Sequence, residues 1–153
     1  MDVVEDLRPH RKALVLAAER VATWMFAPGG VEMTRNGKPT LNKAQLNHLI
    51  GVCGEAECAE EIENYLRYQA GRKGTTGWTT PVTDKVITEA AGALAKLTED
   101  RQRTEAWRLY AIFLTRAFTY QVARLGQRPA AGEQAAPRGQ APQPQRDQRG
   151  GRR

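Results

Sequence analysis

The stretch from Thr98 to about Leu125 constrains the fold of this chain more than any other. Thr98 is a favourable N-cap residue, Glu99 and Asp100 suit a first helical turn, and no Pro interrupts the rest of the stretch. Large apolar residues occupy one side of this helix and others lie away from that side, so the helix is apolar nearly all round. Such a helix is usually buried at the centre of a bundle or between subunits. We therefore expect a long central helix that also faces other copies of the chain. The side chains expected to hold the bundle are Phe113, Leu114, Phe118 and Tyr120.

Four shorter helices are expected before this one. Four segments show apolar residues at helical spacing, and caps or helix breakers separate them. No segment alternates as a strand does. Asn36 and Gly37 mark a turn, but Pro39 discourages a second strand, so this region is expected to be a loop rather than a tiny hairpin. The sequence therefore predicts an all-α fold, a single compact bundle of about five helices. The expected ranges of the first four are about 5–26, 41–53, 57–71 and 80–94.

Local residue pairs predict where these helices begin and end. Thr40 or Asn42 can cap the second helix, and Gln45 lies three residues after Asn42, as a capping box requires. Gly71 is the expected C-cap of the third helix. Thr80, which directly precedes a proline, is the expected N-cap of the fourth.

Residues 127–153 differ in composition from the rest of the chain. They are rich in Pro, Gly, Gln and Arg and have essentially no hydrophobic group larger than alanine, which predicts a disordered tail after a helical domain at 1–126. The net charge of the chain is +6, and the tail holds six arginines against Glu133 and Asp147, or +4, which leaves the domain at +2. Local patches of the domain must therefore recognise any polyanion. The tail could add non-specific RNA affinity, or only solubility.

The chain shows no sign of export or of membrane insertion. Its first residues, MDVVEDLRPH, mix acids and bases and lack the apolar run of a signal peptide. No window approaches the roughly 18 apolar residues that a spanning helix needs. Cys53 and Cys58 are the only cysteines and fit a pair of reduced thiols. We therefore expect a cytoplasmic protein with no membrane partner.

Side chains suited to catalysis or to metal binding are sparse. His10 and His48 are the only histidines, and the chain has no serine. Cys53 follows His48 by five residues, so the two would not share the helix face that a Cys–His nucleophile needs. The cysteines also lack the Cys-x-x-Cys spacing of structural zinc sites. We expect no enzyme activity, no metal and no cofactor.

Basic residues offer better candidates for function. The segment GRKGTTGW lacks the ending of a P-loop, yet it combines backbone donors and hydroxyl groups with Arg72 and Lys73. It could hold a phosphate of a nucleic-acid backbone, or it could be only a polar connection. Arg101, Arg108 and Arg116 recur along one side of the last helix, where they could pair with acids or line a groove.

Three stretches resemble, in the same order, segments of the small helical subunit of type III CRISPR effector complexes, especially of the III-A kind. TLNKAQLNHLI (40–50) is similar to the family's Leu-Thr-x-Ser-Gln-Leu/Ile-Arg helix start. YLRYQAGR (65–72) is similar to its Leu-x-Tyr-x-Ala-Gly-Arg segment, and FLTRAFTYQVARLG (113–126) to its Phe-x-x-x-x-Glu-Ala-x-x-Ala-Tyr end. Together the stretches span about residues 40–126. The chain departs from the family pattern at Ala44 (Ser), Asn47 (Arg) and Arg116 (Glu).

This resemblance implies a non-catalytic subunit that stacks in several copies along the duplex of guide RNA and target RNA and contacts its backbone. Its partners would be the guide RNA, the target RNA, other CRISPR effector subunits and copies of itself. Base pairing, rather than this subunit, would read the sequence. The RNA-binding residues expected are Lys43, Gln45, Arg67 and Arg72, carried over by motif, and Lys73, Arg108 and Arg116, added on charge and position alone.

Two other functions fit the same residues. Residues 41–53 and 57–72 could form the helix-turn-helix of a DNA-binding regulator, although glutamates crowd the start of the second helix, where bases would be read. Alternatively, the chain is a small helical adaptor without a nucleic-acid role. Retention on one duplex sequence would support the regulator. A complex that survives nuclease treatment through protein contacts alone would support the adaptor.

Overall fold

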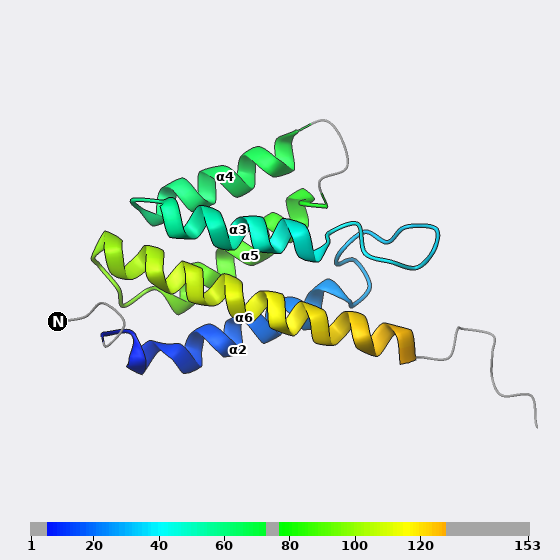
Figure 1. The fold of residues 1–153 in the computed structure, drawn as a ribbon, viewed down its shortest axis with the longest axis horizontal. Helices are drawn as coiled ribbons and strands as arrows, with labels where there is room; N and C mark the ends of the chain where they lie inside the picture. Colours follow the sequence, from blue (N-terminus) through cyan, green and yellow to red (C-terminus); the bar gives the residue numbers. More distant parts are fainter. Residues whose placement is uncertain (1–5, 73–76, 128–153) are drawn as a thin grey trace, which may run out of the picture.

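A computed structural model describes residues 6–72 and 77–127, and this part of the chain is all-helical (Figure 1). A short 3₁₀ turn precedes five α-helices in these ranges, which confirms the predicted all-α bundle. The last helix continues through Gln127, and the rest of the predicted tail lies outside the described residues. The elements are η1 (Arg8–His10), α2 (Arg11–Met25), α3 (Lys43–Glu55), α4 (Ala59–Gly71), α5 (Thr80–Ala93) and α6 (Asp100–Gln127).

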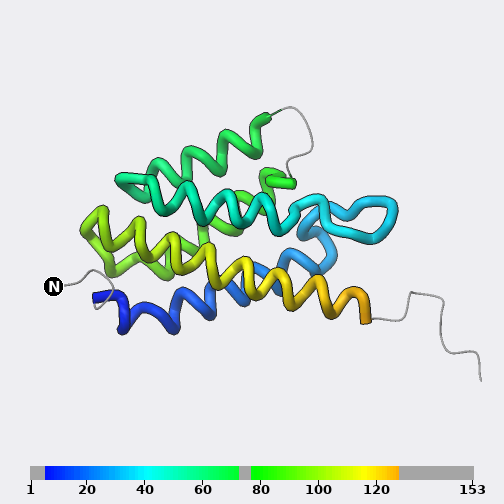
Figure 2. Tube along the Cα trace, viewed as in Figure 1, coloured from blue at the N-terminus to red at the C-terminus, as the bar shows by residue number. Residues whose placement is uncertain are grey.

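Helix α6 is the centre of the bundle, as its apolar sequence predicts. It packs along α2 on one side and α3 on the other and also contacts α4, while α5 packs on α2 and α4 (Figures 1 and 2). Trp107 and Tyr110 are fully buried and meet edge to face, with ring centroids 5.4 Å apart. The Tyr110 hydroxyl donates a hydrogen bond of 2.9 Å to the carbonyl oxygen of Val86 in α5. The buried residues of α6 are Thr104, Ala106, Trp107, Leu109, Tyr110, Ala111, Leu114, Thr115 and Phe118.

The first helix is interrupted near its start. Within the expected range 5–26, regular α-helix begins only at Arg11, and a 3₁₀ turn that contains Pro9 precedes it. Proline fixes φ and lacks an N–H group, so it suits an opening turn but not a helix interior. Leu7, just before the turn, is completely buried and anchors this end of the chain to the core.

The connection between α2 and α3 is closed by one antiparallel bridge between Met33 and Pro39, where the sequence predicts a plain loop. The Thr34 N–H donates to the Lys38 carbonyl oxygen at 2.6 Å, and a second backbone bond lies on the other side of the bridge. Pro39 itself occupies a position that donates no hydrogen bond, so its missing N–H group is harmless there. Gly37 forms the tip with φ of +74°.

The predicted capping box of α3 is confirmed. The Gln45 N–H donates to Asn42 Oδ1, and the Asn42 N–H donates to Gln45 Oε1, each at 2.9 Å. Both side chains are therefore committed to backbone groups that the helix itself leaves unpaired. The helix ends at Glu55, two residues later than expected.

The caps of α4 and α5 differ from the prediction. Gly71 is the last residue of α4 and does not adopt a positive φ, and the chain continues extended at Arg72, so the glycine C-cap is wrong. Helix α5 is capped by Thr79, one residue before the predicted Thr80, and the Thr79 hydroxyl accepts from the Val82 N–H at 3.4 Å. The threonine that precedes Pro81 is instead the first helical residue, with the proline in the first turn.

A close backbone contact joins the start of α5 to the start of α3. Gly77 has φ of +77°, and a Cβ added to it would come within 2.5 Å of the Leu41 Cα. Leu41 and Trp78, the residue after Gly77, are both buried. The glycine therefore allows two segments that are far apart in sequence to pack backbone against backbone.

Candidate nucleic-acid interface

Exposed basic residues from several elements lie at one end of the bundle, and others, such as Lys12, Lys96 and Arg101, lie at the opposite end. The connection after α2, the start of α3, the end of α4 and the end of α6 all point to the right in Figure 1. The opposite end of the α3–α4 pair is acidic, because the end of α3 and the start of α4 carry exposed glutamates. We call the first region the basic end. Its exposed bases are Arg35, Lys38, Lys43, Arg67, Arg72 and Arg124, and the exposed acids of the opposite end are Glu55, Glu57, Glu60 and Glu61.

The two candidates at the start of α3 are used differently. Lys43 is the first residue of the helix, is exposed and forms no ion pair within the described part of the chain. Gln45 is half-buried and its side-chain oxygen is occupied by the capping box. The structure therefore presents the Lys43 ammonium to solvent, while Gln45 orders the backbone beneath it.

The two candidates on α4 are exposed and loosely held. Arg67 lies 3.9 Å from Glu63, with 61% of its side chain exposed, so the pair is weak and solvent-screened. Arg72 donates to Gln69 Oε1 at 3.3 Å, and its guanidinium lies 5.7 Å from the ring centroid of Tyr68. Both guanidinium groups keep donors for a phosphate. Lys73, the third predicted base of this region, lies outside the described residues.

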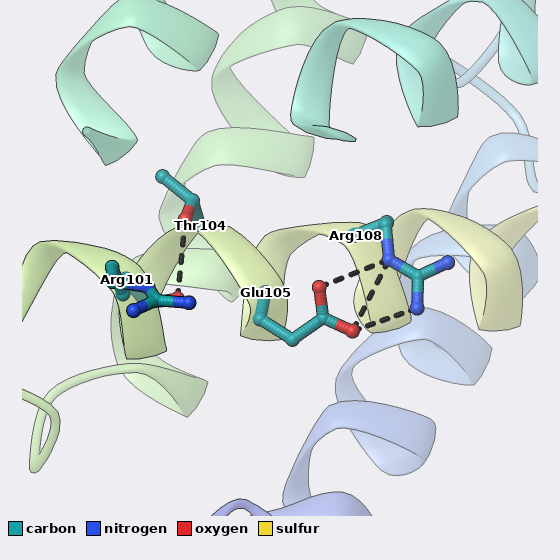
Figure 3. Close-up of polar contacts among 4 residues, drawn as sticks. All are labelled: Arg101, Thr104, Glu105 and Arg108. Atoms are coloured by element: carbon teal, nitrogen blue, oxygen red, sulfur yellow. Dashed lines mark hydrogen bonds and ion pairs between the residues drawn. The ribbon is translucent and has the colours of Figure 1, made fainter. Parts of the chain in front are cut away.

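The arginines of the last helix could pair with acids or line a groove. Arg108 does the first, because it pairs with Glu105. Its Nε and Nη2 donate to the Glu105 carboxylate at distances down to 2.7 Å (Figure 3). This hydrogen bond raises the pKa of the Arg108 guanidinium. Arg101 stays exposed, and its backbone carbonyl accepts from the Thr104 hydroxyl at 3.1 Å (Figure 3).

Arg116, unlike Arg108, lines a groove. The groove lies between α2 and α6 and has a volume of about 610 Å³. Arg116 stands 5.9 Å from the ring centroid of Phe113, and Arg11 of α2 stands 5.7 Å from it. Further along α6, Arg124 lies 6.0 Å from the ring of Tyr120. The groove is lined by Val15, Glu19, Thr23, Phe113, Arg116, Ala117, Tyr120, Gln121 and Arg124.

The exposure of Tyr120 corrects the sequence prediction that this residue holds the bundle. Tyr120 is 63% exposed, whereas Phe118 is buried and packs on Phe26 with ring centroids 5.3 Å apart. The spacing of Tyr120 and Arg124, four residues apart on a helix, could have indicated their contact. Nothing in the local sequence predicts that Arg11 reaches Phe113, because the two lie on different helices.

Cys53 and His48, the two side chains that a Cys–His nucleophile would need, have other surroundings in the structure. Cys53 is buried, and desolvation raises the pKa of its thiol to about 12, so it is a poor nucleophile at neutral pH. The His48 ring instead lies beside the Tyr65 ring, with centroids 5.7 Å apart. Within the described ranges, no three His, Cys, Asp or Glu side chains are grouped so as to hold a metal ion.

Comparison with known proteins adds no assignment. The chain matches no protein-family model, no curated protein and no solved structure. None of its described helices combines the length and the hydrophobicity needed to cross a membrane. What the residues themselves offer is a helical scaffold with a basic end and an arginine-lined groove.

Proposed function

We propose that this chain is the non-catalytic small subunit of a type III CRISPR ribonucleoprotein effector complex. Several copies stack along the duplex of guide RNA and target RNA, beside other effector subunits. Each copy contacts the sugar–phosphate backbone through its basic end. The subunit positions the duplex, and base pairing supplies the sequence recognition.

One observation carries this proposal. Three residues that the family resemblance assigns to RNA, Lys43, Arg67 and Arg72, are all exposed and all belong to the basic end. They come from two antiparallel helices, and further bases from the connection after α2 extend the same region. Clustered lysines and arginines bind a nucleic-acid backbone by displacing its counterions. The glutamates at the opposite end of the α3–α4 pair repel the same backbone and so favour contact of this pair through the basic end.

The DNA-binding regulator has weaker support. In a helix-turn-helix pair formed by α3 and α4, the first turn of α4 would enter the major groove. That turn presents Glu60 and Glu61, which are both exposed and would face the phosphates and base edges of DNA. The arginines of α4 lie instead at its other end, where a recognition helix does not read bases.

Fluorescence anisotropy with an RNA duplex, measured against salt concentration, tests the proposal. The triple variant Lys43→Gln, Arg67→Gln and Arg72→Gln should bind more weakly to every sequence and should reduce the salt slope by about three, one for each lost phosphate contact. The matched control removes the same charge from the other end of the bundle: Lys12→Gln, Lys96→Gln and Arg101→Gln, all exposed positions.

The outcomes separate the candidate functions. Equal weakening by the two triple variants would mean that only total charge matters, and the basic end would lose its role. Tight retention on one DNA duplex would favour the regulator. If no RNA binds and the purified complex keeps its proteins after nuclease treatment, the chain is an adaptor.

A further inference from the structure

The groove between α2 and α6 differs in chemistry from the basic end. It is a hollow that combines an exposed aromatic residue with arginine side chains, and it shares only Arg124 with the basic end. Its volume of about 610 Å³ lies in the range of roughly 300–1,000 Å³ that is typical of sites for small organic groups. A single planar group can therefore enter it from solvent.

Tyr120 supplies a stacking surface in this groove. Tyr120 is 63% exposed, and Arg124 lies 6.0 Å from its ring centroid. Phe113 is unsuited to the same role, because it is half-buried and two guanidinium groups already lie near its ring. An aromatic base stacked on Tyr120 would gain the contact that single-strand-binding proteins use with any base sequence.

The charges at the groove favour phosphates near its arginines. Arg11, Arg116 and Arg124 form no ion pair with any carboxylate of the described residues. Glu19 lines the groove together with Arg116 and Arg124, disfavours a phosphate beside itself, and can accept a hydrogen bond from a base amino group. A ligand that fits has a neutral planar group flanked by anions, which describes an unpaired nucleotide in a strand.

We propose that this groove binds single-stranded RNA, with one unpaired base stacked on Tyr120 and the flanking phosphates on Arg116 and Arg124. That the strand is RNA rests on the function proposed above, and the stacking site itself follows from the groove. A double helix cannot use this site, because its bases are already stacked on one another. The chain thus has two RNA surfaces, one for the duplex and one for an unpaired segment beside it.

The test uses the full chain and an oligouridine of about 12 nucleotides, a length within the usual site sizes of single-strand binders. Tyr120→Ala should weaken binding about tenfold, the usual effect of losing one stacked base. Tyr120→Phe keeps the ring and should bind as the unchanged chain does. Val122→Ala is the control on the same helix, because Val122 is 38% exposed and does not line the groove. An abasic strand of the same length should bind the Tyr120→Ala variant and the unchanged chain with equal affinity.

Three results would overturn the inference. Equal losses in Tyr120→Ala and Val122→Ala would show that the effect does not depend on the groove. An equal loss for the abasic strand would show that the ring only supports the arginines. Unchanged single-strand binding in Tyr120→Ala, together with lost association between copies or with a partner protein, would assign the groove to a protein. Since the duplex assay with the basic-end variants is independent of Tyr120, failure here and failure of the proposed function are distinguishable.

Discussion

The backbone of Gly77 packs directly against the backbone of Leu41, so closely that a side chain on the glycine would come within 2.5 Å of the Leu41 Cα. This contact ties the segment before α5 to the segment before α3 and thus supports the basic end from within. Glycine is required at position 77 for two reasons, because a side chain would clash there and because φ is +77°.

Gly77→Ala should destabilise the fold. A strained positive φ and a backbone clash together should lower the free energy of unfolding by about 2 kcal/mol or more. Urea unfolding measures this change. Gly51→Ala is the control with the opposite sign, because Gly51 lies inside α3 with nothing within 4 Å of an added Cβ and should stabilise by about 0.5–1 kcal/mol. Equal stabilities of the two variants would contradict the close packing.

Asn42→Ala should remove the capping box of α3. The loss leaves the Gln45 N–H without its acceptor and should lower the free energy of unfolding by about 1 kcal/mol. Thermal unfolding provides the measurement. Asn47→Ala, an exposed position inside the same helix, should be neutral or slightly stabilising because alanine has the higher helix propensity. A neutral Asn42→Ala variant would mean that water replaces the cap without loss.

Arg108→Gln should change stability but not RNA binding, and Arg116→Gln should change RNA binding but not stability. Arg108 is held by Glu105 at 2.7 Å and is partly buried, so its loss should reduce stability by about 0.5–1 kcal/mol and leave the salt slope for RNA unchanged. Arg116 is exposed and has no ion pair in the described ranges, so its loss should leave stability unchanged and weaken single-strand binding. If Arg108→Gln weakens RNA binding without loss of stability, the Glu105 pair opens to receive RNA.

Stability should fall as the pH rises above about 9. Burial raises the pKa of the Cys53 thiol from 9.0 to about 12, and burial also raises the pKa of the Tyr110 hydroxyl. The unfolded chain therefore loses these protons at lower pH than the folded chain, so the stabilisation is complete below pH 9 and decreases above it. Each group contributes up to about 1.4 kcal/mol per pH unit. Urea unfolding at increasing pH should show a shallower decline in Cys53→Ala, and an identical decline would contradict the burial of the thiol.

Local sequence determined the helices of this protein and the long helix at its centre. The capping box of α3 was predictable because both partners lie within one helical turn, where backbone geometry alone brings them together. The central place of α6 was predictable because a helix that is apolar nearly all round must be covered on several sides. Errors arose at helix boundaries, such as Thr79 in place of Thr80, where neighbouring residues can perform the same cap.

Tertiary structure alone decided which side chains face solvent and where the groove lies. The pair of Arg108 with Glu105 is local, because the two residues lie three apart on one helix, whereas Arg116 lines a groove that exists only because α2 packs beside α6. The contact of Arg11 with Phe113 and that of Gly77 with Leu41 join segments far apart in the chain. Helix formation and pairs within one helix depend on residues a few positions apart, whereas exposure and contacts between helices depend on which distant segments pack together, and no local pattern contains that information.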